Sequence, residues 1–145
     1  MFRVAVFAAL GLWVLIAAAP AAWAGWYNAS WAYCQQITVD YTKVPNTDQA
    51  NFPVYVNLAN LSSGFFSHVN ANGSDIRVTT SDGTTEVPRE VVAIATGSST
   101  GEVWFKAGTL STLTNTDFYL YYGNSGAAEP AANATYGSQN VWDAK

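Results

Sequence analysis

Hydrophobic and polar residues alternate with a period of two along much of the chain after residue 30. In residues 31–40, Ile37 and Val39 share one face and polar neighbours occupy the other, and similar alternation recurs at residues 51–58 and 102–106. This period is typical of half-buried β-strands. Turns rich in Gly, Asn, Asp and Ser separate the strands, and no helical periodicity of useful length follows the N-terminal region. The pattern predicts an all-β fold, an antiparallel β-sandwich of jelly-roll type.

Residues 73–90 are predicted to form the β-hairpin around which the domain is organised. Apolar and polar side chains alternate in residues 76–79, and Ser-Asp-Gly at residues 81–83 supplies a turn. Asp accepts main-chain hydrogen bonds and Gly tolerates positive φ, which is why this tripeptide favours a turn. The return arm is expected to cover residues 84–92, interrupted only by Pro88.

Three smaller features complete the predicted sandwich. Residues 117–123 carry aromatic side chains on both faces, which predicts a central strand. Phe65 and Phe66 are expected to pack beneath a loop, with room for a short helical turn. Leu110 and Leu113 are expected to anchor a polar crossing between strands.

The N-terminal region has the features of a secretion signal. Arg3 precedes an unbroken apolar run at residues 4–19, and Ala-Trp-Ala at residues 22–24 is a small-x-small cleavage site. We expect an N-terminal signal helix that is removed after Ala24. The alternative is an uncleaved anchor, because the 22 residues 4–25 carry no charge and about 20 suffice to span a membrane.

The chain therefore divides into a signal peptide, residues 1–24, and a β-sandwich domain, residues 25–124. Residues 125–145 are rich in Ala, Asn and Gly and are interpreted as a linker that leads to the start of a following domain.

Composition narrows the classes of partner and site. Six basic and ten acidic residues give a net charge of −4, and phosphate binding needs clustered Lys and Arg, so nucleic acid is excluded as a partner. Cys34 is the only cysteine, so an internal disulfide is excluded. It is expected to be a buried thiol in the first strand, with an intermolecular bridge as the alternative.

The strand motifs together resemble a known family. They lie in order at residues 31–33, 37–40, 51–54, 73–78, 81–85 with Pro88 and Glu90, 103–106 and 119–124. In this order they are similar to the bacterial and archaeal extracellular family called domain of unknown function 2341. Cys34 and Gln35 depart from it, since the family more often has basic or polar residues there.

The resemblance implies a β-sandwich module of secreted or surface multidomain proteins. Such modules often precede a concanavalin-like, laminin-G-like jelly roll, and residues 141–143 (Val-Trp-Asp) look like the opening of one. The family has no established catalytic residues, so none is transferred to this chain.

The residue inventory does not favour catalysis. His68 is the only histidine and lies in a Gly/Asn-rich stretch, where it is expected to be exposed. With a single cysteine it cannot build a zinc site of usual composition, and no Gly-x-Ser-x-Gly elbow is present. The acidic residues of the strands are expected to pair with Arg77, Arg89 and Lys106 across strands. We therefore predict that the protein is not an enzyme.

Binding is the remaining class of activity. Trp26, Tyr27 and Trp104 are candidate platforms for a sugar ring, although Trp104, as a strand-central tryptophan, is expected to belong to the core instead. Asp75 and Asp82 offer hard oxygen ligands for a structural calcium ion, the only cofactor considered, and turn chemistry explains them equally well.

These observations predict a non-catalytic module that is secreted or held at the cell surface and acts in adhesion or carbohydrate binding within a larger protein. Its partners would be glycans or other surface proteins, and it would meet a membrane only through an uncleaved signal. The alternative is a structural spacer or self-assembly domain of a surface layer or filament. Solvent-exposed aromatic side chains on one sheet favour the former, and unpaired edges with buried aromatics favour the latter.

Overall fold

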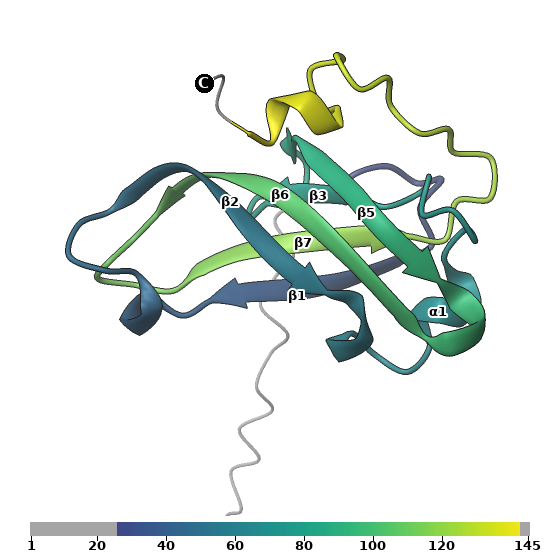
Figure 1. Cartoon of the computed structure of the whole chain (residues 1–145), viewed down its shortest axis with the longest axis horizontal. Coiled ribbons are helices and arrows are strands. Elements are labelled where there is room, and N and C mark those ends of the chain that lie inside the picture. The colour runs from purple at the N-terminus through teal and green to yellow at the C-terminus, as the bar shows by residue number, and fades with distance from the viewer. Residues whose placement is uncertain (1–25, 143–145) are drawn as a thin grey trace, which may run out of the picture.

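Two antiparallel sheets pack face to face in the computed structural model, which describes residues 26–142. The predicted signal helix lies outside these residues. Sheet A has the order β1-β7-β3-β4 and sheet B the order β2-β6-β5. Figure 1 shows the strands of the two sheets overlying each other. The predicted antiparallel β-sandwich is confirmed.

The strands differ in length, and the connections carry short helical turns. The strands are β1 (Tyr33–Val39), β2 (Gln49–Asn57), β3 (Arg77–Thr80), β4 (Glu86–Val87), β5 (Arg89–Ala95), β6 (Thr100–Leu110) and β7 (Thr116–Tyr122). The helices are η1 (Tyr41–Lys43), η2 (Leu58–Asn60), α1 (Phe65–His68), η3 (Thr96–Ser98) and η4 (Ser138–Asn140). In the described part of the chain, no helix has the length and apolar character needed to cross a membrane.

The core lies between the sheets and follows the alternation of the sequence. Val103 and Phe105 of β6 and Phe118 and Leu120 of β7 point inward and are almost completely buried. The α1 turn adds Phe65, which is fully buried, as its position beneath a loop predicts. Burial of apolar surface at about 25 cal/mol per Å² is the main force that holds the two sheets together.

The hairpin at residues 73–90 is shorter than predicted. Its arms pair at Val78–Val87 and Thr79–Glu86, and β5 then pairs with β6 in the other sheet. The expectation of one continuous return arm was therefore wrong. Pro88 marks the point where the chain leaves sheet A, because it has no N–H for a ladder, while its carbonyl accepts the Lys106 N–H at 2.9 Å.

The expectation that Leu113 anchors a crossing between strands was wrong, and a second apolar side chain, Phe52, is also exposed. Leu113 is 81% exposed, so only Leu110 anchors the crossing between β6 and β7. Phe52 lies on the same face of β2 as Val54 and Val56, yet it is 44% exposed. Phe52 lies near the start of β2, the edge strand of sheet B, and lines an apolar groove there.

Strand β7 is central, as its two aromatic faces predict, because it lies between β1 and β3. Its outward residues Tyr119 and Tyr121 form a small second cluster with Trp31. Cys34 packs against this cluster and is half-buried. Burial raises the pKa of the Cys34 thiol to about 11, so it is protonated at neutral pH.

Candidate functional site

Three aromatic side chains lie side by side on the outer face of sheet B. Tyr55 of β2 and Trp104 of β6 are register partners, and their ring centroids are 5.2 Å apart. Trp142, from the C-terminal segment, lies 5.2 Å from Trp104 on the same face. Tyr55 and Trp142 are 46% and 44% exposed. We call these three residues the aromatic row.

The aromatic row faces outward because its neighbours along the strands face inward. On β6, Val103 and Phe105 are fully buried, and a strand directs successive side chains to opposite faces. Trp104 therefore cannot belong to the core between the sheets. It is half-buried only because Tyr55 and Trp142 flank it.

Trp142 is held in place by Glu90. Its indole Nε1–H donates to Glu90 Oε2 at 2.8 Å, and Glu90 of β5 is the register partner of Trp104. The neighbouring Val141 is fully buried. The carboxylate thus fixes the edge of the ring and leaves part of the indole exposed.

The C-terminal segment that carries Trp142 is fastened to sheet B by Arg89. The Arg89 main-chain N–H donates to the Tyr136 carbonyl at 3.2 Å, and its fully buried guanidinium makes two hydrogen bonds to the Glu129 carboxylate. Figure 1 shows this yellow segment crossing beside β5. Residues 125–142, interpreted as a linker from sequence, are therefore packed on the sandwich. Whether another domain follows stays a prediction.

We expect Glu129→Gln to lower the free energy of unfolding by about 1–2 kcal/mol. The amide keeps an acceptor for Arg89 but leaves the buried guanidinium without a counter-charge, which is costly even when the carboxylate is half exposed. Urea denaturation measures this loss. Glu102→Gln, on exposed sheet B surface, is the control and should change stability by less than about 0.5 kcal/mol. Equal stabilities for the two variants would contradict the role given to Glu129.

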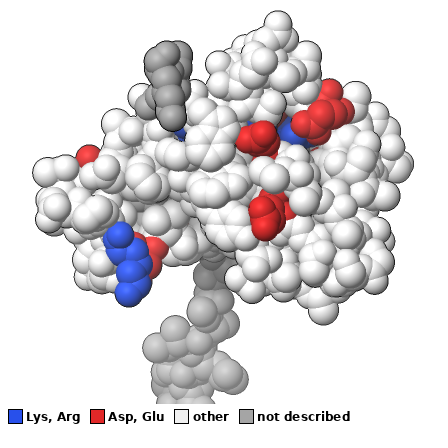
Figure 2. Space-filling view, in the orientation of Figure 1, with Lys and Arg blue, Asp and Glu red and all other residues white. Residues whose placement is uncertain are grey.

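An apolar groove of about 560 Å³ lies along the edge strand β2 and extends beyond the aromatic row. Ten of its twelve lining residues are aliphatic, aromatic or proline, and the other two are Lys43 and Gln49. The groove includes the whole aromatic row, and Val44, Phe52 and Leu110 form its apolar side. Figure 2 shows that the visible face of the molecule is largely uncharged. This volume lies within the range of small-ligand sites, about 300–1,000 Å³.

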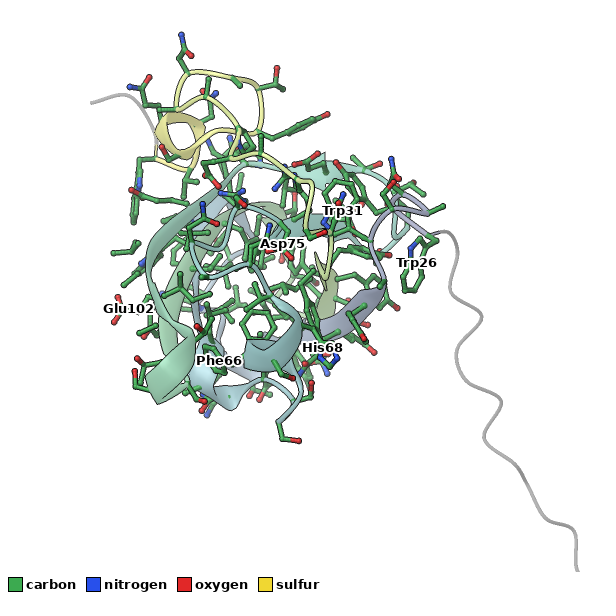
Figure 3. The ribbon with its side chains drawn as sticks, turned by 90° about the vertical axis from the view of Figure 1, so that its right-hand side faces the viewer. Trp26, Trp31, Phe66, His68, Asp75 and Glu102 are labelled. Atoms are coloured by element: carbon green, nitrogen blue, oxygen red, sulfur yellow. The ribbon has the colours of Figure 1, made fainter. Side chains whose placement is uncertain are left out.

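Asp75, a predicted ligand residue, has a different environment. It is fully buried, and its carboxylate accepts main-chain N–H groups of Asn70 at 2.9 Å, Gly123 at 2.7 Å and Asn124 at 3.3 Å. Its own carbonyl accepts the indole N–H of Trp31 at 2.6 Å. In Figure 3, Asp75 lies among the interior side chains, with Trp31 nearby. The geometry gives Asp75 the function of joining the hairpin entry to the end of β7.

Asp82 fixes the turn of the β3–β4 hairpin. Its carboxylate accepts the hydroxyl of Thr85 at 2.5 Å and the main-chain N–H groups of Thr84 and Thr85 at 2.8 Å. Gly83 follows with φ of 74°, a conformation that favours glycine. The Thr85 hydroxyl and these N–H groups hold the pKa of Asp82 far below its usual range.

This depressed pKa predicts that Asp82 contributes to acid stability. An unfolded Asp takes up a proton near pH 3.9, before the folded one does, so the contribution is present above about pH 5 and is lost as pH falls below about 4. Asp82→Asn should remove it. The stability difference between wild type and variant, measured by urea denaturation, should be largest at neutral pH and shrink towards about pH 2. Parallel stability curves over that pH range would contradict this interpretation.

Calcium at Asp75 and Asp82 stays a prediction. Within residues 26–142, no three His, Cys, Asp or Glu side chains are grouped so that they could hold a metal ion. Hydrogen bonds within the chain already engage both carboxylates.

Trp26 and Tyr27 lie on the opposite side of the sandwich from Trp104. Both rings pack on Tyr121, an outward residue of sheet A, with centroid distances of 5.3 and 5.8 Å. The Tyr27 hydroxyl donates to Glu86 at 2.6 Å, and burial together with this carboxylate raises its pKa to about 12. Figure 3 shows Trp26 at the periphery, where the described chain begins. These two residues cover sheet A and do not combine with Trp104 into one site.

The contacts of the remaining polar candidates, His68, Arg77 and Arg89, are with other side chains of the fold. His68 is exposed, as predicted, and its ring lies 4.1 Å from that of Tyr33. Arg77 pairs with Glu86 of the adjacent strand at 3.4 Å, as predicted. Arg89, in contrast, pairs with Glu129 of the C-terminal segment rather than across a strand.

Sequence reasoning missed Tyr55, Trp142 and Glu90 as members of the site. Tyr55 was recognisable, because it alternates with Val54 and Val56 and must face away from them. Nothing in the sequence indicates that Trp142 folds back onto β6, because this contact depends on the path of the C-terminal segment.

The fold and the aromatic row together define a class of protein, a two-sheet β-sandwich module with exposed aromatic side chains on one sheet. Residues 72–139 match the model of the family described as Domain of unknown function (DUF2341), so the predicted resemblance is confirmed over this part of the chain. The matched segment runs from the hairpin entry through Trp104 into the C-terminal segment. A search of curated proteins and a search of solved structures found no match.

Proposed function

We propose that the protein is a non-catalytic, exported module that binds carbohydrate at a cell surface through the aromatic row. The observation that carries this proposal is the partly exposed row of Tyr55, Trp104 and Trp142 on the outer face of sheet B. An apolar sugar face stacks on aromatic rings, while its hydroxyls need nearby hydrogen-bond partners.

Polar groups beside the aromatic row supply such partners. Glu90 already accepts the Trp142 indole, and a carboxylate has further acceptor positions for a sugar hydroxyl. Lys43 and Gln49 also line the groove. Lys43 can donate, and Gln49, whose Nε2 already donates to the carbonyls of Pro45 and Thr47, offers its Oε1 as an acceptor. A few directed polar groups beside aromatic surface are typical of small-ligand sites.

The competing proposal, a spacer or self-assembly domain, receives less support. It would be favoured by aromatic side chains that are all buried, whereas the aromatic row is partly exposed. The carbohydrate-binding module that we propose would act in adhesion as part of a larger secreted protein, with glycans as its partners.

A glycan array probed with the purified protein, with and without calcium, tests the proposed function. We expect binding to a restricted set of glycans, and loss of that binding in Tyr55→Ala, which shortens the aromatic row at its exposed end. Trp26→Ala, on the opposite face, is the matched control and should bind like wild type. Absence of binding to every glycan in both conditions would overturn the proposal.

A further inference from the structure

The rings of the aromatic row are tilted against one another. The planes of Tyr55 and Trp104 meet at 52°, and those of Trp104 and Trp142 at 49°. Stacking on a flat surface requires rings that lie close to one plane. A crystalline polysaccharide face can therefore contact only one of these rings well, whereas a single chain can turn between them.

The groove beside the row also suits a single chain. It passes round the edge strand β2, because Tyr55 lies on the outer face of this strand and Phe52, which lines the groove with Val44 and Leu110, lies on the opposite face. A rigid lattice cannot enter such a groove, but one or two sugar units of a free chain can. The hydroxyl groups of a plain hexose would find few partners on this apolar side, because burying an unpaired hydroxyl is unfavourable.

An acetamido group fits the composition of the groove better. Its methyl can contact the apolar side chains, its N–H can donate to Gln49 Oε1, and its carbonyl can accept from Lys43. Side chains of both signs lie near the aromatic row, and they are Glu90, Glu102, Lys43 and Lys106. These local charges therefore do not favour a ligand of one sign.

We infer that the ligand is a single, soluble chain of neutral N-acetylated hexosamines, with sugar rings on the aromatic row and an acetyl group in the groove beside Phe52. This inference rests on the proposed function. It adds the class of glycan and excludes crystalline polysaccharide as the preferred target.

Calorimetric titration of the whole protein with chitohexaose, in its fully N-acetylated form, and with cellohexaose tests the inference. These chains share their linkage and differ in the acetamido group. We expect chitohexaose to bind about tenfold more tightly, the effect of burying one or two methyl groups. Incubation with crystalline chitin or microcrystalline cellulose should leave most of the protein in solution.

Phe52→Ala identifies the groove as the source of the preference. It should reduce the ratio of the two affinities to about one while cellohexaose binding changes little. Leu113→Ala removes an exposed apolar side chain that does not line the groove, and it should keep the wild-type ratio.

Two results would overturn the inference and leave the proposed function standing. These are equal or weaker binding of chitohexaose in the wild type, and preferential retention on a crystalline polysaccharide. A protein that binds no glycan at all, on the array or in titration, would instead overturn the proposed function itself.

Discussion

Trp104→Ala should abolish measurable binding of chitohexaose while the protein stays folded. Trp104 is the central ring of the aromatic row and contacts both Tyr55 and Trp142. Removing a central tryptophan from a binding surface typically costs 2 kcal/mol or more, about thirtyfold in affinity. The loss should exceed that estimate, because Trp142 also loses the ring against which it packs.

The fold should tolerate this change because Trp104 lies outside the core between the sheets. We expect a loss of stability of about 1 kcal/mol, measured by urea denaturation. Trp26→Ala is the control, since it also removes a partly exposed tryptophan, but from sheet A. If Trp104→Ala binds within twofold of wild type, or if Trp26→Ala loses binding equally, the aromatic row is not the binding surface.

The largest effect on stability is expected for Asp75→Ala, a loss of about 3–5 kcal/mol. The substitution leaves the main-chain N–H groups of Asn70, Gly123 and Asn124 without their acceptor. An unsatisfied buried donor costs about 1–3 kcal/mol, and a domain of this size has only about 5–15 kcal/mol in total. Urea or thermal denaturation measures the loss.

Asp75→Asn refines this test. Asparagine keeps the size and one acceptor oxygen but points an amide NH₂ at one of the donors, so an intermediate loss is expected. Asp117→Ala is the matched control, because its half-buried carboxylate accepts only the Thr38 hydroxyl among the hydrogen bonds of the described chain, and its loss should cost less than about 1 kcal/mol. A stability loss at Asp75 no larger than that at Asp117 would contradict the role given to the buried carboxylate.

Local patterns in the sequence were sufficient to predict the sandwich. The alternation in β1, β6 and β7 identifies inward residues such as Val103 and Phe105, because a strand has only two faces. The aromatic outer face of β7 likewise indicated a central strand. What the local pattern could not show is a change of sheet within one apparent strand, as at Pro88, since both arms alternate in the same way.

The candidate site was harder to predict than the fold, because its residues come together through long-range contacts. Trp104 was identified from its sequence, and burial of Val103 and Phe105 places it on the outer face, but its contact with Tyr55 depends on the register between β2 and β6. The position of Trp142, and with it the hydrogen bond between Trp142 and Glu90, follows from the return of the C-terminal segment, which the Arg89–Glu129 pair fastens. Low-complexity composition in that segment favours a linker, and composition alone carries no information about a buried valine or an ion pair further along.

The central claim is that the aromatic row is the ligand-binding surface. Its most direct test is a nitrogen–proton magnetic resonance spectrum of the nitrogen-labelled protein. The spectrum is followed during titration with a mixture of chitohexaose, cellohexaose and mannohexaose. Each tryptophan indole gives a separate signal, and Trp31, buried and bonded to the Asp75 carbonyl, serves as internal reference. We predict that the indole signals of Trp104 and Trp142 shift while those of Trp31 and Trp26 do not. Shifts at Trp26 without shifts at Trp104 and Trp142, or a spectrum unchanged by all three glycans, would contradict the claim.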